Sequence, residues 1–351
     1  MQTYEMYMRR CLQLARLGAG FVAPNPMVGS VLVYGNRIIG EGYHMQYGQA
    51  HAEVNCLNSV AEHERHLIPS CTLFVSLEPC AHYGKTPPCA DLVIRYNIAT
   101  VVVGCRDPFT LVSGKGKEKM QKAGIQVIVG VLEKECIELN KRFFVFNVKQ
   151  RPFVLLKWAQ SSNRMISKAD GSPIAISNGF TNRFVHQCRS IEAGILIGTN
   201  TAINDNPQLN NRWWTGNHPV KRLVLDLNLR LPSHLHIFNQ QQPTIVFNKH
   251  RQGDHHHLTY YKIDAELPLV PQLLGACYTL QLQSILVEGG ARLLQSFIDE
   301  GLWDEALVIE NTTLVIEDGL AAPKISNYTL ADTTYYLDDR IQRLVKIGSS
   351  L

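Results

Sequence analysis

The spacing of hydrophobic residues in the first part of the chain predicts alternating helices and strands. Residues 4–17 carry apolar side chains at positions 4, 7, 8, 11, 12 and 15, which is the period of an amphipathic helix. Valine-rich or alternating runs further along predict strands. The expected strands are 29–33, 37–43, 71–76, 100–104 and 125–130, and the expected later helices are 51–60, 89–96, 116–123 and 133–147. Strands that alternate with helices are typical of a layered α/β domain.

The second part of the chain repeats this rhythm after a polar joint at residues 149–152. We place a domain boundary there and expect one domain of residues 1–148 and another of residues 149–351. The expected strands are 153–158, 194–198, 223–227, 244–247, 284–288 and 305–309, and a helix is expected at 292–300. The polar stretch 251–261 is expected to be an exposed loop, and the tail beyond residue 311 carries no motif.

Composition agrees with a two-domain globular protein. A chain of 351 residues is long for a single core, and 45% hydrophobic with 18% charged residues is ordinary. The net charge of +4 does not favour nucleic-acid binding, and no apolar run approaches the ~20 residues that span a bilayer. The N-terminus lacks a secretory signal pattern, and the nine cysteines form no disulfide-like framework. We therefore expect a cytoplasmic protein without a membrane segment.

One histidine and two cysteines have the pattern of a catalytic zinc site. His51 is followed two residues later by Glu53, and Pro79-Cys80 and Pro88-Cys89 come downstream. Three protein ligands leave the fourth position of zinc open for water, and bound zinc lowers the pKa of that water to roughly 7. Glu53 is then placed to carry protons rather than to bind metal. This order of residues is typical of zinc deaminases.

A structural zinc site is the alternative to this hypothesis. It requires a fourth protein ligand, which Cys71 or His82 could supply. A closed site would leave Glu53 without a role, so the sequence favours a hydrolytic centre. The run at residues 255–257 is a separate candidate, but three adjacent histidines cannot all converge on one ion.

The order of motifs resembles the bifunctional deaminase–reductase of riboflavin biosynthesis. In the first half these motifs are Pro24-Asn25-Pro26, His51-Ala52-Glu53, the segment Glu78–Cys89 and Asp107-Pro108. In the second half they are Lys157-x-Ala159-x-Ser161, His186-x-x-Arg189, Gly198-Thr199-x-Thr201, Asp205-x-Pro207-x-Leu209-x-x-Arg212 and Glu288-Gly289-Gly290. The resemblance implies an N-terminal cytidine-deaminase-like three-layer α/β domain and a C-terminal dihydrofolate-reductase-like α/β domain.

The resemblance also implies two reactions on one phosphorylated pyrimidine. The first is zinc-dependent hydrolytic deamination of 2,5-diamino-6-(5-phosphoribosylamino)pyrimidin-4-one, with Glu53 as the catalytic residue. The second is reduction of the ribosyl side chain to ribityl with NADPH, which supplies the hydride. The implied partner is this small molecule, without nucleic acid or membrane, and the enzyme is expected to be a homo-oligomer.

The family's site residues carry over to matching positions of this chain. Zinc would be held by His51, Cys80 and Cys89. The substrate-binding residues would be Asn25, Arg189, Leu209, Arg212 and Glu288, and the cofactor-binding residues would be Ala159, Ala175, Thr201, Asp205, Gly289 and Gly290. Glycines before a helix let backbone N–H groups approach a phosphate.

Several positions depart from the family's pattern. Asn163-Arg164 stands where the family commonly has Asp-Gly, Ala175 where many relatives have tryptophan, and Phe109-Thr110 where Asn-Pro is more usual. These departures keep an alternative open, a deaminase-only enzyme with a degenerate reductase domain. The sequence also leaves open whether the cofactor is NADPH or NADH.

Overall fold

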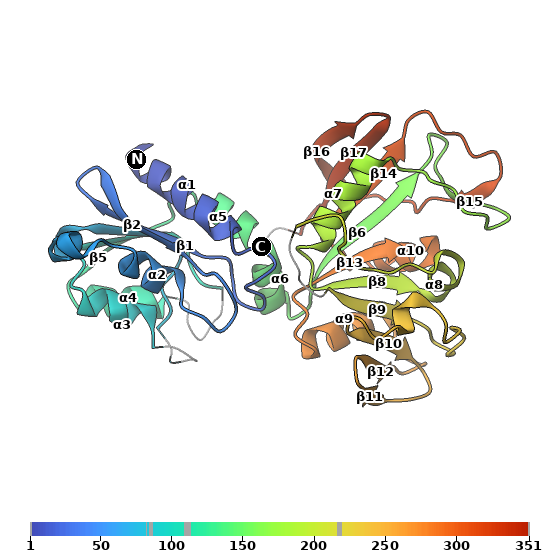
Figure 1. The fold of residues 1–351 in the computed structure, drawn as a ribbon, viewed down its shortest axis with the longest axis horizontal. Coiled ribbons are helices and arrows are strands. Elements are labelled where there is room, and N and C mark those ends of the chain that lie inside the picture. The colour runs from blue at the N-terminus through green and yellow to red at the C-terminus, as the bar shows by residue number, and fades with distance from the viewer. Residues whose placement is uncertain (1, 82, 84–86, 109–113, 216–219, 350–351) are drawn as a thin grey trace. The chain divides into compact units, whose positions relative to one another are not determined.

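The chain consists of two compact units, Met1–Lys149 and Gln150–Leu351, each built around its own β-sheet (Figure 1). The computed structural model describes residues 2–81, 83, 87–108, 114–215 and 220–349. His82, Phe109 and Thr110 lie outside these described residues. Within the described part of the chain, no helix has the length and apolar character needed to cross a membrane.

The sheet of the first unit has five strands in the order β2-β1-β3-β4-β5. Its strands are β1 (Gly29–Tyr34), β2 (Arg37–Tyr43), β3 (Thr72–Leu77), β4 (Thr100–Cys105) and β5 (Gln126–Val129). Strand β1 is antiparallel to both β2 and β3, whereas β3, β4 and β5 run parallel to one another. Parallel neighbours bring the carboxyl ends of their strands to one edge, where α/β sheets commonly hold their sites.

Helices cover both faces of this sheet, which gives three layers (Figure 1). The helices are α1 (Gln2–Arg16), α2 (Ala52–Asn58), η1 (Glu62–Ser70), α3 (Cys89–Arg95), α4 (Lys115–Lys122), α5 (Glu133–Leu139) and α6 (Lys141–Lys149). Val101 and Val103 pack into the core on the side of α2, α3 and α4, whereas Val102 packs on the side of α1 and α5. This alternation explains why β4 is apolar along its whole length, since both of its faces are buried.

One helix expected in the first unit is two helices. The sequence predicts a single helix over residues 133–147, but α5 ends at Leu139 and α6 begins at Lys141. The break is at Asn140, whose side chain accepts a hydrogen bond from the Met27 N–H at 2.8 Å and donates one to the Met27 carbonyl at 2.8 Å. These two bonds anchor Asn140 to the segment after α1, and helical periodicity contains no sign of them.

The second unit has a ten-stranded sheet in the order β11-β12-β10-β9-β8-β13-β6-β14-β17-β16, and a small sheet of β15 with β7. Strands from β12 to β14 in this order run parallel, and the outer strands β11, β17 and β16 are antiparallel to their neighbours. The strands are β6 (Phe153–Gln160), β7 (Met165–Lys168), β8 (Gly194–Gly198), β9 (Lys221–Leu225), β10 (Thr244–Asn248), β11 (Gly253–His255), β12 (Leu258–Lys262), β13 (Ser284–Gly289), β14 (Glu305–Asn311), β15 (Gly319–Ala321), β16 (Tyr328–Tyr336) and β17 (Asp339–Lys346).

Helices lie on both faces of the large sheet as well. They are α7 (Gly179–Arg189), α8 (Thr199–Asp205), η2 (His236–Phe238), α9 (Leu269–Thr279) and α10 (Ala291–Asp299). One apolar core includes α9 and α10, and a second core on the other face includes Ala202 of α8 and Ile237 of η2. The carboxyl ends of β6, β8, β9 and β13 lie along one edge, where the expected reductase residues follow.

One expectation for the second unit is wrong, and its tail, for which the sequence offers no expectation, has a regular structure. Residues 251–261 are not a loop, because β11 and β12 pair as a hairpin at the edge of the large sheet. The tail beyond residue 311 forms β15, β16 and β17, and β17 pairs with β14 over the whole of that strand. These segments are half exposed, so their hydrophobic pattern is weak, and tertiary pairing determines their structure.

Candidate active sites

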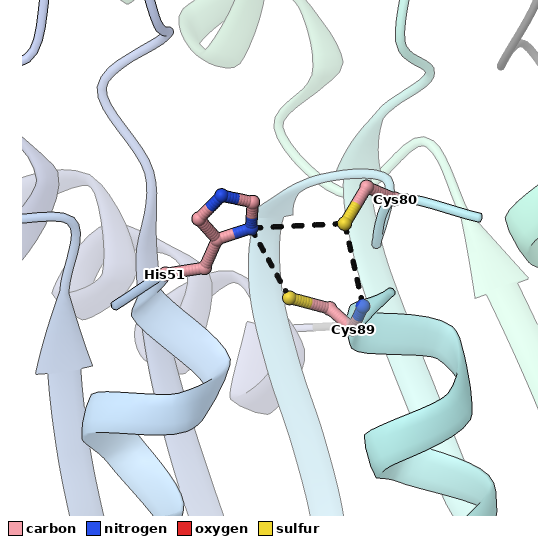
Figure 2. A group of neighbouring side chains, drawn as sticks. All are labelled: His51, Cys80 and Cys89. Atoms are coloured by element: carbon pink, nitrogen blue, oxygen red, sulfur yellow. Dashed lines mark hydrogen bonds between the residues drawn. The ribbon is translucent and has the colours of Figure 1, made fainter. Parts of the chain in front are cut away.

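His51, Cys80 and Cys89 converge on one point in the first unit (Figure 2). The Nδ1 atom of His51 lies 3.6 Å from the Cys80 Sγ and 3.3 Å from the Cys89 Sγ. Zinc bonds of roughly 2.0–2.3 Å in tetrahedral geometry separate neighbouring ligand atoms by about 3.5 Å. The three side chains therefore fit a single zinc ion, with Nδ1 as the nitrogen that faces it.

Local structure places each of these ligands. His51 is the N-cap of α2 in an extended conformation, and Cys89 is the first residue of α3. Cys80 follows β3, and the backbone N–H of Cys89 donates to its Sγ at 3.3 Å. Two helix starts and one strand end thus meet at the sheet edge, as the sequence predicts.

Without metal, the two thiols of the site have opposite pKa shifts. The hydrogen bond from the Cys89 thiol lowers the pKa of Cys80 to about 4, although burial opposes this shift, and the same bond raises the pKa of Cys89. Zinc binds thiolates rather than thiols. Glu53 is 3% exposed, and burial followed by the negative charge of Cys80 raises the pKa of its carboxyl group. A carboxyl group whose pKa is raised accepts a proton more readily, which suits a group that carries protons.

The fourth ligand of a structural site is not found among the described residues. Cys71 is buried and donates its thiol to the Leu67 carbonyl at 3.3 Å. Within the ranges that the structure describes, His51, Cys80 and Cys89 form the one group of three or more side chains able to hold a metal. His82, the other candidate, lies outside those ranges.

His44 links Asn25 to the zinc ligands, because it contacts both Asn25 and His51. The Nδ1 of His44 is 3.0 Å from the Ala50 carbonyl, which can only accept, so Nδ1 carries the proton. The Nε2 of His44 then accepts from the Asn25 Nδ2 at 3.2 Å. The His44 and His51 rings pack edge to face with centroids 5.4 Å apart. This chain of bonds orients the Asn25 carboxamide beside the metal site.

Glu78 is a positioning residue to which sequence reasoning assigned no role. Its buried carboxylate accepts the backbone N–H groups of Gly114 and Lys117, both at 3.1 Å. It thereby ties the start of α4 to the segment that carries Cys80. A Cβ at Gly116 would lie 2.1 Å from the Pro79 carbonyl oxygen, so only glycine fits there. The signal for this role is that Glu78 begins the zinc motif and that glycine recurs near residue 116.

In the second unit, Arg189 and Glu288 bind each other at the carboxyl end of β13. The Nε of Arg189 is 2.7 Å from one Glu288 carboxylate oxygen, and its Nη2 is 2.5 Å from the other. Burial favours the neutral form of Glu288, but Arg189 and Lys157 overcome it and lower its pKa to about 2. Burial lowers the pKa of Lys157, and the Glu288 charge opposes that shift. The structure therefore brings together Lys157, Arg189 and Glu288 as a partly buried charged group.

The residues expected at the cofactor also meet. A Cβ added at Gly290 would lie 3.1 Å from the Thr201 Oγ1, and one at Gly289 would lie 3.3 Å from it. Gly290 is the N-cap of α10. This glycine cradle fits a bound phosphate, because backbone N–H groups at a helix start can reach it only when no side chain intervenes.

The remaining expected residues differ in how they can reach a ligand. Leu209 is 2% exposed and belongs to the apolar core, so its backbone rather than its side chain is available. Asp205 ends α8 and is exposed, and Arg212 is exposed as well. Ala159 is half-buried on β6, whereas Ala175 is exposed and precedes Ile176 outside any helix or strand. No described contact joins Ala175 to the cofactor cradle.

The departures at Asn163 and Arg164 leave their turn intact. Asn163 donates its Nδ2 to the Ile316 carbonyl at 2.8 Å, and its Oδ1 accepts the Ile316 N–H at 3.2 Å and the Ser161 hydroxyl at 2.6 Å. Arg164 has φ of +62°, in the left-handed region that glycine adopts without cost. An amide serves both Ile316 groups, which a carboxylate could not do. The arginine occupies its conformation at a cost of about 1 kcal/mol.

Comparison with known proteins finds one protein-family model for each of the two units. The model for the cytidine and deoxycytidylate deaminase zinc-binding region matches residues 1–105, and the model for the RibD C-terminal domain matches residues 152–315. The riboflavin biosynthesis protein RibD of Aquifex aeolicus is 38% identical over 306 residues, which is 86% of this chain and 85% of that protein. The chain belongs to the RibD family. Escherichia coli RibD is 33% identical, covering 87% of this chain and 86% of that protein.

Solved structures extend the likeness to the whole fold. A diaminohydroxyphosphoribosylaminopyrimidine deaminase/5-amino-6-(5-phosphoribosylamino)uracil reductase from Thermotoga maritima superposes with a TM-score of 0.90 at 34% identity, covering 98% of this chain and 99% of that one. Acinetobacter baumannii RibD gives 0.89 at 31% identity with the same coverage. The chain is therefore a bifunctional deaminase and reductase of riboflavin biosynthesis. A zinc-binding deaminase domain and a reductase domain, which implies a nicotinamide cofactor, are both present.

Proposed function

We propose that this chain deaminates 2,5-diamino-6-(5-phosphoribosylamino)pyrimidin-4-one and then reduces the ribosyl side chain of the product, 5-amino-6-(5-phosphoribosylamino)uracil. The observation that carries the proposal is the convergence of His51, Cys80 and Cys89 beside buried Glu53, in a chain that also holds the Glu288–Gly289–Gly290 edge. The deaminated product of the first unit is then the substrate of the second.

In the deamination, we assign proton transfer to Glu53. Zinc held by His51, Cys80 and Cys89 would supply an acidified water. The raised pKa of Glu53 suits a group that accepts the water's proton and gives protons to the ring nitrogen and the departing amine. Asn25, oriented by His44, would read the edge of the pyrimidine ring, because its amide both donates and accepts.

In the reduction, we assign cofactor binding to Thr201, Gly289 and Gly290 and substrate binding to Arg189, Arg212 and Glu288. The remaining family positions, Ala159, Ala175, Asp205 and Leu209, keep the roles that the resemblance implies. The cofactor would supply a hydride to C1 of the sugar. Glu288, ionised and fixed by Arg189, is suited to hold a sugar hydroxyl, because a carboxylate accepts hydrogen bonds in a defined direction.

We propose that the cofactor is NADPH rather than NADH, because of the residues that follow β9. The cofactor's pyrophosphate at Gly289–Gly290 would direct its adenosine half along the neighbouring β8 and β9, whose carboxyl ends share the same edge. The buried Asp226 there accepts the backbone N–H groups of Arg230 and Leu231, so its carboxylate is engaged. Arg230 reaches Asn200 of α8 at 3.4 Å. A cationic side chain at this end suits a 2′-phosphate.

We also propose that the enzyme is a cytoplasmic homo-oligomer. Strand β16 is an edge of the ten-stranded sheet and exposes Tyr328, Leu330 and Tyr335. Long edge strands with exposed apolar side chains favour pairing with another strand. The structure describes all nine cysteines, and none of them forms a disulfide, which suits a reducing compartment. Sedimentation of the purified chain would test the oligomer.

An experiment on the proposed substrate tests the two activities together. Purified chain is given the diaminopyrimidine, and ammonia release is measured first. NADPH or NADH is then added, and its oxidation is followed at equal concentrations. We expect ammonia release that a zinc chelator abolishes, followed by faster oxidation of NADPH than of NADH. Ammonia release from the chelated protein would refute the zinc assignment.

A further inference from the structure

The segment that follows Leu209 is attached to α7 around Arg212. The Nη1 of Arg189, on α7, donates to the Asn210 carbonyl at 3.3 Å. One turn earlier on the same helix, the Nδ1 of His186 accepts the backbone N–H of Arg212 at 3.2 Å. Residues 186 and 189 share a face of α7 because they are three positions apart. The backbone of Arg212 is thus tied directly to the helix that carries the Glu288 partner.

The side chain of Arg212 is in turn supported by Trp213. The guanidinium carbon of Arg212 lies 4.8 Å from the centre of the Trp213 ring, a cation–π contact. Its Nη1 donates to the Asn210 Oδ1 at 2.9 Å. The Trp213 ring packs against the His186 ring, with centroids 4.9 Å apart and planes inclined by 49°. Among the described residues, one face and one donor of the guanidinium are engaged, and its other N–H donors remain for a ligand.

His186 is suited to hold this arrangement because it is neutral. It is 3% exposed, and burial, followed by the positive charges of Arg189 and Arg212, lowers its pKa to about 4. A neutral imidazole can accept the Arg212 N–H with Nδ1 and present its ring to Trp213 without adding charge beside the two arginines.

We propose that Trp213 is a positioning residue that holds the Arg212 guanidinium ready for the 5-phosphate of the reductase substrate. The inference rests on the proposed role of Arg212 in substrate binding and assigns that role to the substrate's phosphate, whose oxygens match a guanidinium group. An exposed arginine loses rotamer freedom when it binds a ligand, and that loss lowers affinity. Stacking on Trp213 restricts Arg212 before the substrate arrives. The sequence motif ends at Arg212 and gives no role to Trp213, which is 48% exposed.

The test compares Trp213→Ala with two other variants of the full-length enzyme. Trp213→Phe keeps an aromatic face for the cation, and Trp214→Ala removes a neighbouring indole of similar exposure, 41%. No ring or cation contact of Trp214 with another described residue is present. The kcat and KM of NADPH oxidation are measured with 5-amino-6-(5-phosphoribosylamino)uracil and with its dephosphorylated form. The KM for NADPH and the far-ultraviolet circular dichroism serve as controls for the cofactor site and the fold.

We expect Trp213→Ala to raise the KM for the phosphorylated substrate about fivefold, with kcat within twofold of the parent. Trp213→Phe should restore most of the loss, and Trp214→Ala should behave as the parent. Neither Trp213→Ala nor Trp214→Ala should change the KM for the dephosphorylated substrate. In an Arg212→Ala background, Trp213→Ala should no longer raise the KM for the phosphorylated substrate. These results together support the positioning role.

Two outcomes would overturn the positioning role of Trp213. They differ in whether the phosphate role of Arg212 fails as well. If Arg212→Ala raises KM while Trp213→Ala resembles Trp214→Ala, Trp213 does not position Arg212, and the phosphate role of Arg212 stands. If Arg212→Ala leaves the KM for the phosphorylated substrate unchanged, the proposed phosphate role itself fails, and the positioning role fails with it.

Discussion

The two candidate sites each contain a buried glutamate, and the two carboxyl groups have opposite pKa shifts. Burial and the charge of Cys80 raise the pKa of Glu53. Burial also acts on Glu288, but Arg189 and Lys157 outweigh it and lower the pKa to about 2. A raised pKa suits a group that takes and releases protons, whereas a lowered pKa suits a group with a permanent charge. The same residue type therefore serves as a proton carrier in one unit and as a fixed anchor in the other.

The two glutamates should also differ in how much they contribute to stability. Glu53 has no cationic ion-pair partner among the described salt bridges, so its neutral amide should fold as well as the acid does. Glu288 neutralises Arg189, whose side chain is 13% exposed, so loss of the carboxylate leaves a buried cation. Replacement of Glu53 should therefore affect activity alone, whereas replacement of Glu288 should affect both activity and stability.

The largest effect should follow removal of a zinc ligand. We expect Cys80→Ala to lose bound zinc and to reduce deamination by at least ~10⁴-fold, because the acidified water is lost. Zinc content by atomic absorption and ammonia release measure the two losses. Cys71→Ser is the matched control and should retain zinc, since Cys71 bonds only the Leu67 carbonyl among the described residues. Equal zinc loss in both variants would contradict the ligand assignment.

Glu53→Gln should reduce deamination by about 10³-fold and leave the zinc content unchanged. Because Glu53 is buried and has no cationic partner among the described salt bridges, an amide of the same shape should leave the melting temperature unchanged. The reductase rate of the same sample, measured with the deaminated substrate, is the internal control. Near-normal ammonia release would remove Glu53 from the mechanism.

Glu288→Gln should reduce the reductase rate by about 10²-fold and lower the stability of the second unit by about 3 kcal/mol. Asp304→Asn is a matched control, because Asp304 also holds a buried arginine, Arg151, through two hydrogen bonds of 2.6 and 2.7 Å. It should lose similar stability and keep its kcat. Denaturant unfolding and NADPH oxidation separate the two effects. Equal kcat losses in the two variants would show that Glu288 acts only through the fold.

His186 should make the second unit less stable in mild acid. Its pKa in the folded protein is about 4, below the ordinary value of 6.5, so the unfolded chain binds its proton first. Stability should therefore be fully present above pH 6.5 and fall by about 3 kcal/mol as pH decreases toward 4. Urea unfolding of the parent and His186→Gln across this range measures the difference. The variant should show a flatter profile, and parallel profiles would contradict the assignment.

Asn163→Asp should lower stability by about 1 kcal/mol, although it restores the residue common in the family. The carboxylate cannot donate to the Ile316 carbonyl as the Asn163 Nδ2 does. Asn182→Asp is a control on α7, because Asn182 accepts the Ser177 hydroxyl through its oxygen. Unchanged stability of Asn163→Asp would show that the turn does not depend on the amide.

Sequence reasoning located the zinc site because its ligands follow elements with strong hydrophobic patterns. Strands β3 and β4 are apolar on both faces, and the ligands come directly after β3 or at helix starts. The break at Asn140 was missed because it depends on bonds to Met27, far away in the sequence. The edge hairpin of β11 and β12 was missed because its strands are polar and gain their structure from β10.

In the reductase unit, residue type and spacing were a weaker guide. The motif placed Arg189 and Glu288 in the site, but their mutual ion pair becomes visible only when α7 and β13 are brought together. Leu209 was expected to contact substrate, yet its side chain lies in the core. Trp213 and Glu78 act through neighbours, and a sequence pattern contains no information on those contacts.

The most direct test of the account is the ratio of the two products formed by one sample. Purified enzyme is supplied with the diaminopyrimidine substrate and excess NADPH, and ammonia and oxidised cofactor are measured at completion. Two active units acting in sequence predict one mole of NADPH oxidised for each mole of ammonia released. Full ammonia release without NADPH oxidation would contradict the bifunctional account and leave a deaminase alone.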